Sequence, residues 1–240
     1  MNRKYQFKIF VDFDGTITKQ DVGEQLFLKF GDERRVAAII ENLLEDKISS
    51  EQCWKELCEI TTVPASSILD EFFNSFGIDE TFHHLIDYCN RNNIGLFVLS
   101  DGFDYYIKKI FSRENIDLPF FANKLEISGN RLIPSFPYLN ENCTESANCK
   151  WCHIISNSSD EDYTVYVGDG NSDRHSAQFC DFIFAKTDLL KYCEINRISY
   201  FPFNNFQDVI DKLESIRTRK RLKKRHQAIL KRREAYRIEY

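Results

Sequence analysis

The sequence lacks any long uninterrupted apolar segment, and this absence excludes one large class of protein. No stretch of the 240 residues approaches the roughly 18 consecutive apolar residues that a helix needs to span a bilayer. The apolar run near the N-terminus meets charge at Asp12 and Asp14, unlike the core of a signal peptide. We therefore expect a cytoplasmic protein with no membrane span.

Internal repeats are absent as well, and low-complexity sequence is confined to the basic C-terminal end. Apolar residues make up 42% of the chain, including 21 phenylalanines, so there is enough material for a substantial core. The composition is not that of a disordered protein. The length suits one α/β core with a smaller inserted domain, or two modest domains.

Positive charge is scarce over most of the chain and concentrated at its end. Residues 217–240 carry a net charge of +9, which leaves −14 on the rest. Such a tail could bind nucleic acid or an anionic membrane, dock on the acidic body, or mediate contacts within a dimer. We expect a charged, solvated terminal helix in preference to these alternatives, and do not expect nucleic acid as a partner.

The cysteine content permits three interpretations. Without a signal peptide, we expect the eight thiols to be reduced. Cys149 to His153 matches the C-x-x-C-H pattern of c-type haem attachment, which we reject because it would need export and would place a porphyrin over Lys150. Zinc held by Cys143, Cys149, Cys152 and His153 is a chemically reasonable alternative.

Short apolar runs alternate with helical patterns, which predicts a parallel, doubly wound α/β sheet. The expected strands cover Lys8 to Val11, Ile94 to Leu99, Thr164 to Val167, Phe182 to Ala185 and Ile198 to Phe201. The expected helices between them cover Tyr105 to Arg113, Ser172 to Phe179 and Phe206 to Ile216.

Two insertions interrupt this alternation. Residues 18–80 contain several amphipathic stretches and no convincing strand, which indicates a helical cap. Residues 122–134 alternate around Gly129-Asn130, a pair suited to a two-residue hairpin turn, which predicts a β-hairpin flap. The expected domains are a core of residues 1–17 and 81–215, a cap of residues 18–80, and a tail of residues 216–240.

Carboxylates follow the first and third apolar runs, where an open α/β sheet binds its ligands. Asp12 and Asp14 are two residues apart in an extended segment, so both side chains project to the same side. One carboxylate can attack phosphorus while a second exchanges a proton with the leaving oxygen. Asp169 and Asp173 follow the third run and offer the oxygen ligands that Mg²⁺ prefers, with Asp12 and Asp169 as the expected direct ligands.

Neutral and positive groups complete this pattern. Ser100 follows the second run, and the backbone N–H groups of Asp101 and Gly102, expected at a helix start, can donate to phosphate oxygens. A cation should balance the equatorial phosphate oxygens. Lys150 is the first candidate for it, with Lys124 and Lys186 as substitutes.

These residues resemble the motifs of the haloacid dehalogenase superfamily, in its phosphoserine phosphatase-like branch. The matching segments are DFDGT from Asp12, LSDG from Leu99, Lys150, and GDGNSD from Gly168. The resemblance implies a phosphatase with Asp12 as nucleophile, Asp14 as acid/base with its backbone carbonyl on magnesium, and Ser100 and Lys150 on phosphate. It also implies Asp169 on magnesium with Asp173 in support, and a small phosphorylated metabolite as substrate.

Three features look more like the methionine-salvage phosphatases that act on 2-hydroxy-3-keto-5-methylthiopentenyl 1-phosphate. Asp21 stands where a phosphoserine phosphatase carries a glutamate that reads the substrate's amino group. Cys143, Cys149 and Cys152 cluster around Lys150, as cysteines do in that group. The interval in sequence from Lys150 to Asp169 is short, as it is in that group. Ser172 replaces an asparagine usual in phosphoserine phosphatases.

Other functions stay open from sequence. Phosphoserine, phosphoethanolamine and phosphocholine phosphatases share the general layout, and a phosphotransferase would use the same Asp12 nucleophile with an alcohol as acceptor. A nucleic-acid-binding protein with an inactive enzyme core is the remaining alternative, on account of the basic tail.

Overall fold

The structure is a computed structural model that describes residues 5–140, 143 and 146–238. Its seven strands have the order β4-β3-β2-β1-β5-β6-β7 in a mostly parallel sheet. The chain divides into two compact units. The first unit comprises residues 1–12, 78–99 and 150–240, and the second comprises residues 13–77 and 100–149.

The first unit is a parallel sheet covered by helices on both faces. Its strands are β1 (Phe7–Asp12), the first part of β2 (Gly95–Phe103), β5 (Tyr163–Gly168), β6 (Phe182–Ala185) and β7 (Phe201–Pro202). β1 is central, since it pairs in parallel with both β2 and β5. Covering both faces buries nearly every side chain of β1 and β5, which explains why both are almost continuously apolar.

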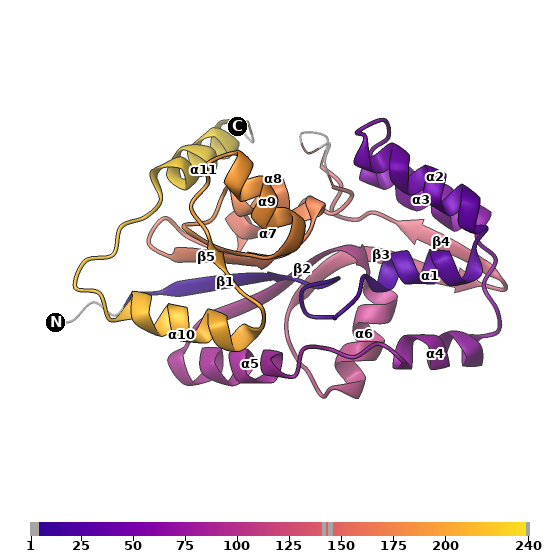
Figure 1. The fold of residues 1–240 in the computed structure, drawn as a ribbon, viewed down its shortest axis with the longest axis horizontal. Helices are drawn as coiled ribbons and strands as arrows, with labels where there is room; N and C mark the ends of the chain where they lie inside the picture. Colours follow the sequence, from indigo (N-terminus) through magenta and orange to yellow (C-terminus); the bar gives the residue numbers. More distant parts are fainter. Residues whose placement is uncertain (1–4, 141–142, 144–145, 239–240) are drawn as a thin grey trace. The chain divides into compact units, whose positions relative to one another are not determined.

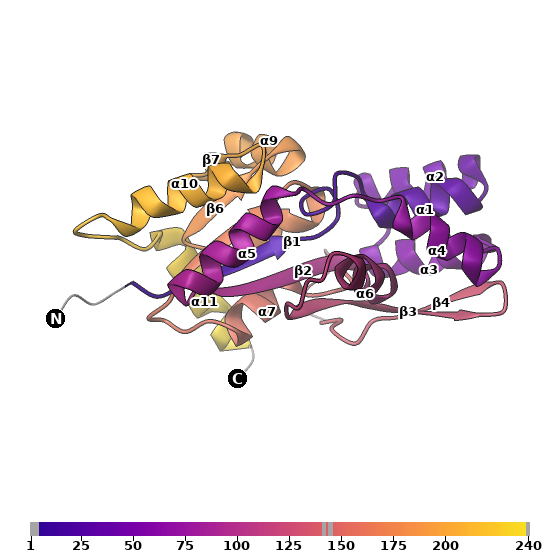
Figure 2. The same cartoon turned by 90° about the horizontal axis from the view of Figure 1, so that it is seen from below.

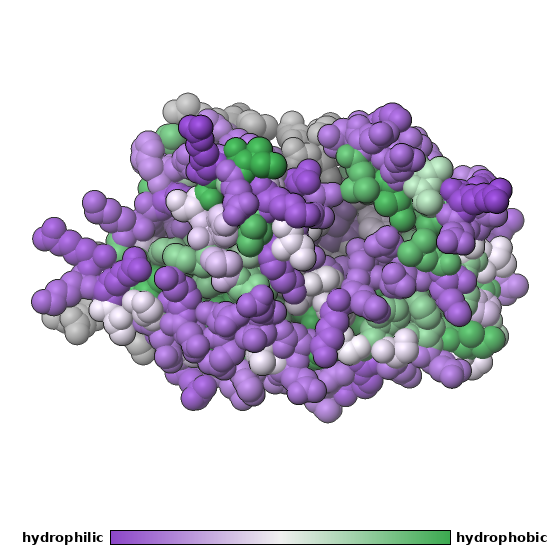
Figure 3. Space-filling view, viewed as in Figure 1, coloured by the Kyte–Doolittle hydropathy of each residue, from purple (hydrophilic) through white to green (hydrophobic). Residues whose placement is uncertain are grey.

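Six helices cover the described part of this sheet, and Figure 1 shows how they are divided between its faces. One face carries α5 (Thr81–Asn92) and α10 (Phe206–Arg217). The other carries α7 (Lys150–Ser156), α8 (Arg174–Ala177), α9 (Thr187–Ile195) and α11 (His226–Ile238). The outer side of α5 and α10 is largely hydrophilic in Figure 3, while α10 turns Val209 and Leu213 inward.

The second unit combines four helices of the predicted cap with the predicted hairpin (Figure 2). The helices are α1 (Val22–Phe30), α2 (Glu33–Leu44), α3 (Ser50–Ile60) and α4 (Ser66–Asn74). The hairpin strands are β3 (Phe120–Ser128) and β4 (Arg131–Ser135), with Gly129 at φ 58° in the turn. α6 (Asp104–Arg113) packs against β3, and α3 against β4.

The hairpin and the α/β alternation are confirmed, while the predicted domain boundaries stay a prediction. Two predicted elements are wrong in extent. The expected strand from Ile198 shrinks to β7, because the Ile198 N–H still bonds to Cys193 O and finishes the preceding helical turn. The expected helix from Ser172 becomes a 3₁₀ turn (Asn171–Asp173) followed by the four-residue α8, since the N–H groups of Gln178 and Phe179 bond three residues back.

The expectation of a solvated terminal helix is also wrong, because α11 docks on the first unit. Arg232 is only 5% exposed and donates to Thr164 Oγ1 at 2.9 Å and Phe179 O at 2.6 Å. Its other terminal nitrogen lies 3.3 Å from Asp181 Oδ1. Part of the tail's charge therefore serves internal packing, which is the docking alternative that the sequence left open.

No helix in the described residues is long and apolar enough to cross a bilayer. The cytoplasmic location stays a prediction.

Candidate active site

Three carboxylates gather at the carboxyl ends of two neighbouring strands of the first unit. Asp12 is the last residue of β1, and Asp169 directly follows β5. The 3₁₀ turn that comes next carries Asp173. One oxygen of each carboxylate lies within 4.8 Å of the others. The structure thus brings together the carboxylates of three of the four acidic residues that the sequence assigned to a metal, and Asp14 is the fourth.

Lys150 lies at the start of α7 and is completely buried beside these carboxylates. Its Nζ donates to Asp12 Oδ1 at 2.6 Å, to Asp173 Oδ1 at 2.7 Å and to Ser172 Oγ at 2.9 Å. Burial alone would lower the lysine pKa, but the two carboxylates outweigh it and raise the pKa above its usual value. Lys150 is therefore the cation that accompanies Asp12, while Lys124 lies exposed on β3.

Asp173 is held as a fixed acceptor. Besides Lys150, Tyr166 Oη donates to its Oδ1 at 2.6 Å, and the backbone N–H groups of Asp169 and Gly170 donate to its Oδ2 at 3.0 and 3.1 Å. These four bonds fill the acceptor positions that a carboxylate offers. Asp173 is thus suited to orient the loop and Lys150, while direct coordination of a metal by Asp12 and Asp169 stays a prediction.

The charges in this cluster do not balance, and the imbalance suits a cation. One ammonium faces three carboxylates, and burial followed by repulsion from Asp173 raises the pKa of Asp12 well above its usual value. A divalent cation with oxygen preference would offset this repulsion and favour the ionised Asp12. The donor set therefore fits Mg²⁺, with Asp12 and Asp169 as the carboxylates that could hold it.

A second cluster, in the second unit, is built around Asp14. Its Oδ2 accepts from Tyr106 Oη at 2.8 Å and from Ser100 Oγ at 3.1 Å. Its Oδ1 accepts from the backbone N–H of Val22 at 3.0 Å. Ser100 Oγ in turn accepts from Gly102 N at 2.9 Å. The predicted acid/base and the predicted phosphate-binding serine are therefore hydrogen-bonded neighbours.

Asp101 and Gly102 do not begin a helix as expected. β2 continues to Phe103, and α6 begins at Asp104. The Asp101 side chain accepts from Ser50 Oγ and, at 2.8 Å, from Asn148 N. The buried Asn148 also donates to Ser100 O at 2.7 Å. These bonds fix the backbone around Ser100, while the role of Asp101 and Gly102 toward phosphate stays a prediction.

Asp21 caps α1, since its Oδ1 accepts from Glu24 N at 2.7 Å. Its side chain is exposed. The capping bond alone explains an aspartate here, and the predicted contact with substrate stays a prediction.

Three site residues escaped the sequence argument. Tyr106 and Tyr166 each place a buried hydroxyl on a site carboxylate, and Asn148 holds the Ser100 backbone. In sequence the two tyrosines are indistinguishable from the aromatic core residues around them. The polar asparagine directly before Cys149-Lys150 was the one available signal.

The cysteines differ from the expectation of eight reduced thiols. Cys149 and Cys152 are disulfide-bonded, whereas the other six cysteines have free thiols. Two of the four ligands considered for zinc are therefore not thiolates in this structure. Among the described residues, the aspartate cluster is the group that could hold a metal ion.

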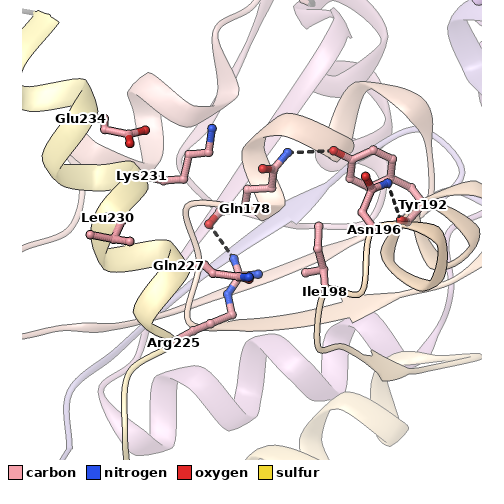
Figure 4. A pocket seen from close by; sticks show the side chains of 9 residues that line it. All are labelled: Gln178, Tyr192, Asn196, Ile198, Arg225, Gln227, Leu230, Lys231 and Glu234. Atoms are coloured by element: carbon pink, nitrogen blue, oxygen red, sulfur yellow. Dashed lines mark hydrogen bonds between the residues drawn. The ribbon is translucent and has the colours of Figure 1, made fainter.

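The first unit also contains a hollow of about 330 Å³ that includes no predicted site residue (Figure 4). It is lined by α9, α11 and the chain around them, with Lys231 and Glu234 on α11. Gln178 donates to Tyr192 Oη at 2.9 Å on its wall. Arg225 donates to the Gln178 carbonyl at 2.6 Å, which makes this arginine part of the docking of the tail.

Comparison with known families agrees with the arrangement of these residues. The family model described as haloacid dehalogenase-like hydrolase matches residues 9–178, a span that includes Asp12, Lys150 and Asp169. The chain belongs to the haloacid dehalogenase-like hydrolase family. This confirms the superfamily predicted from the motifs and, with it, the prediction of an enzyme of the phosphatase type.

Two relatives named 2-hydroxy-3-keto-5-methylthiopentenyl-1-phosphate phosphatase match nearly the whole hydrolase. The protein of Bacillus mycoides is 29% identical over 216 residues, which cover 87% of this chain and 96% of the relative. That of Bacillus cereus is 27% identical over 212 residues, with the same coverage. The predicted resemblance to this group is thus confirmed as a resemblance.

Solved structures of phosphoserine phosphatase share the fold of this hydrolase. One, described as a phospho-aspartyl intermediate analogue, superposes with a TM-score of 0.67 at 22% identity and covers 88% of this chain and 99% of its own. A substrate-bound phosphoserine phosphatase matches equally well. At this identity the likeness shows the fold alone, and it confirms the predicted doubly wound α/β fold.

Proposed function

We propose that this hydrolase is a magnesium-dependent phosphatase that cleaves a small phosphate monoester through a phosphoaspartate on Asp12. The observation that carries the proposal is the buried cluster in which Lys150 Nζ lies 2.6 Å from Asp12 Oδ1 and three carboxylates lie within 4.8 Å. A single ammonium among three carboxylates, two of them buried, leaves an excess of negative charge that is costly to maintain. A catalytic use for one of these carboxylates explains its presence.

In the first proposed step, a carboxylate oxygen of Asp12 bonds to phosphorus as the bond to the leaving oxygen breaks. Asp14, two residues along the chain, gives its proton to that oxygen. In the second step, water loses a proton to Asp14 and attacks phosphorus. Inorganic phosphate leaves and the Asp12 carboxylate is regenerated.

The remaining predicted residues serve this reaction by binding and orientation. Lys150 and the Ser100 hydroxyl bind phosphate oxygens, and Asp173 keeps Lys150 in place. Bound Mg²⁺, held by Asp12, Asp169 and the Asp14 backbone carbonyl, would neutralise phosphate charge.

For the substrate we propose the methionine-salvage type, 2-hydroxy-3-keto-5-methylthiopentenyl 1-phosphate. Support comes from the two Bacillus relatives, which match over 96% of their length, and from Asp21 and Ser172 in the sequence. Phosphoserine is the second candidate, supported by the shared fold. Phosphoethanolamine and phosphocholine complete the set to be compared. A dimeric state stays a prediction.

The test is a turnover assay of the purified chain with these four phosphate esters. We expect hydrolysis that needs Mg²⁺ and falls by at least about 10⁴-fold in Asp12→Asn, since the nucleophile is lost. Full turnover by that variant, or in the presence of chelator, would overturn the proposal. Products formed with added alcohols distinguish a phosphotransferase, because only that enzyme would pass phosphate from Asp12 to the alcohol.

A further inference from the structure

Tyr106 is the buried group in the second cluster whose function no motif explains. It lies in the first turn of α6 and is fully buried, and its hydroxyl approaches Asp14 Oδ2 to 2.8 Å. We propose that Tyr106 is a positioning residue that holds the Asp14 carboxyl in the orientation needed to protonate the leaving oxygen. This inference rests on the acid/base role proposed for Asp14.

Both oxygens of the Asp14 carboxyl accept hydrogen bonds. Tyr106 donates to Oδ2, while the Val22 N–H donates to Oδ1 at 3.0 Å. Donors on different oxygens fix the rotation of the carboxyl plane, which one donor alone leaves free. Catalysis by proton transfer depends on this orientation, because the proton must be directed at the reacting oxygen.

Ser100 cannot do this work throughout the reaction. Its hydroxyl lies 3.1 Å from the same Oδ2, but a hydroxyl has one hydrogen to donate. If that hydrogen binds a phosphate oxygen, as proposed above, the serine no longer donates to Asp14. Tyr106 then remains in place as a side-chain donor to Oδ2.

The residues packed around Tyr106 hold its hydroxyl next to Asp14 Oδ2. Its ring packs against Phe73 at 5.9 Å and against Phe13 at 6.0 Å between centroids. A Cβ at Gly102 would overlap the hydroxyl, and a Cβ at Gly23 would lie 3.2 Å from it. Two glycines therefore make room for this one oxygen.

The geometry makes Tyr106 a hydrogen-bond donor, since its hydroxyl lies 2.8 Å from Asp14 Oδ2. Burial, followed by the negative charges of Asp14 and Asp21, raises the pKa of Tyr106 well above its usual value, in agreement with this role as a donor.

The test compares two substrates that differ in how much they need a proton. An alkyl phosphate has a strongly basic leaving oxygen and requires the acid, whereas p-nitrophenyl phosphate has a weakly basic one and does not. In Tyr106→Phe we expect kcat/KM for the alkyl ester to fall by about 10- to 100-fold, and that for the aryl ester to fall by less than about threefold. The ratio of the two is insensitive to any fraction of unfolded protein.

Tyr105→Phe is the matched control, since Tyr105 is the preceding residue of the same helix and its ring lies under Lys109 at 5.0 Å. It should leave both values unchanged. In an Asp14→Asn background, Tyr106→Phe should cause no further loss with the alkyl ester, because its effect passes through Asp14.

The outcomes separate this inference from the proposed function. If wild-type protein hydrolyses neither ester, the proposed phosphatase function fails. If wild type is active and Tyr106→Phe slows both esters equally, or neither, the positioning role is overturned while the phosphatase stands.

Discussion

The two clusters of site residues are held together by different forces. In the first unit, the ammonium of Lys150 bridges Asp12 and Asp173 with its charge. In the second unit, Asp14 is held by the hydroxyls of Tyr106 and Ser100 and by a backbone N–H, all of them neutral. The charged cluster suits the binding of a cation and a phosphate, whereas neutral donors orient the Asp14 carboxyl for the acid/base role that we propose for it.

The strongest test of this contrast is removal of the charged bridge by Lys150→Met. Because Asp12 and Asp173 would lose their buried cation, we expect the free energy of unfolding to fall by about 3–5 kcal/mol, with loss of turnover. Urea denaturation of the variant measures the effect. Lys124→Met, at an exposed position of β3, should change stability by less than about 0.5 kcal/mol. Equal stability of the two variants would show that charge does not hold the first cluster.

The second cluster should be sensitive to shape rather than charge, which Gly102→Ala tests. The added methyl would overlap the Tyr106 hydroxyl and lie 2.7 Å from Asp14 Oδ2. We expect kcat/KM for alkyl phosphates to fall by about 10²-fold through displacement of Asp14, and stability to fall by about 1–3 kcal/mol. Gly77→Ala, with no atom within 4 Å of the new methyl, should be silent. Unimpaired turnover by Gly102→Ala would mean that the packing around Asp14 is loose.

A charged contact outside the site sharpens the comparison further. Arg232 is 5% exposed, and Arg232→Ala removes its guanidinium from Asp181, Thr164 and Phe179 O. We expect a loss of about 2–3 kcal/mol in the free energy of unfolding, because Asp181 loses its buried partner. The neighbouring exposed Arg233→Ala should cost less than about 0.5 kcal/mol. Matching denaturation curves for the two variants would contradict the docking of α11.

The smallest expected effect is a pH dependence of stability that comes from the burial of His153. Burial lowers the pKa of His153 from 6.5 to about 4. Between these pH values the unfolded chain binds a proton at this histidine and the folded chain does not. The contribution of His153 to the free energy of unfolding is therefore fully present above about pH 6.5 and is lost as the pH falls toward 4. From pH 7.5 to pH 5 the loss should be at most about 2 kcal/mol, and His153→Gln should lack it. Parallel stability profiles for wild type and variant would refute this assignment.

Much of the fold was predictable because burial on both faces leaves a clear trace in sequence. The runs around β1 and β5 are apolar without alternation, and Gly129-Asn130 marks the hairpin turn. The limits of elements were less predictable. Ile198 looked like the start of a strand, yet its N–H completes the turn after α9. Here a hydrogen bond to Cys193 O, five residues back, decided the competition between a helix end and an edge strand, and composition does not record such a bond.

The site shows the same division. Asp12, Asp14, Ser100, Asp169 and Asp173 could be named from sequence, because carboxylates and a serine that follow buried runs are conspicuous. Lys150 could be named because a phosphate site needs a cation. Tyr106 and Tyr166 could not, since a tyrosine in an apolar setting looks like any other core aromatic until its hydroxyl is located. Likewise, Arg232 appeared to be one more charge in a basic tail.

The sequence by itself determined the family, the order of the strands and helices, and the acidic residues available for chemistry, because these depend on local pattern and residue type. The tertiary structure decided which groups meet: that Lys150 rather than Lys124 reaches Asp12, that Asp173 has its acceptor positions filled, and that a tyrosine holds Asp14. Such contacts join residues up to 138 positions apart in sequence, and only the packing of the folded chain brings them within hydrogen-bonding distance.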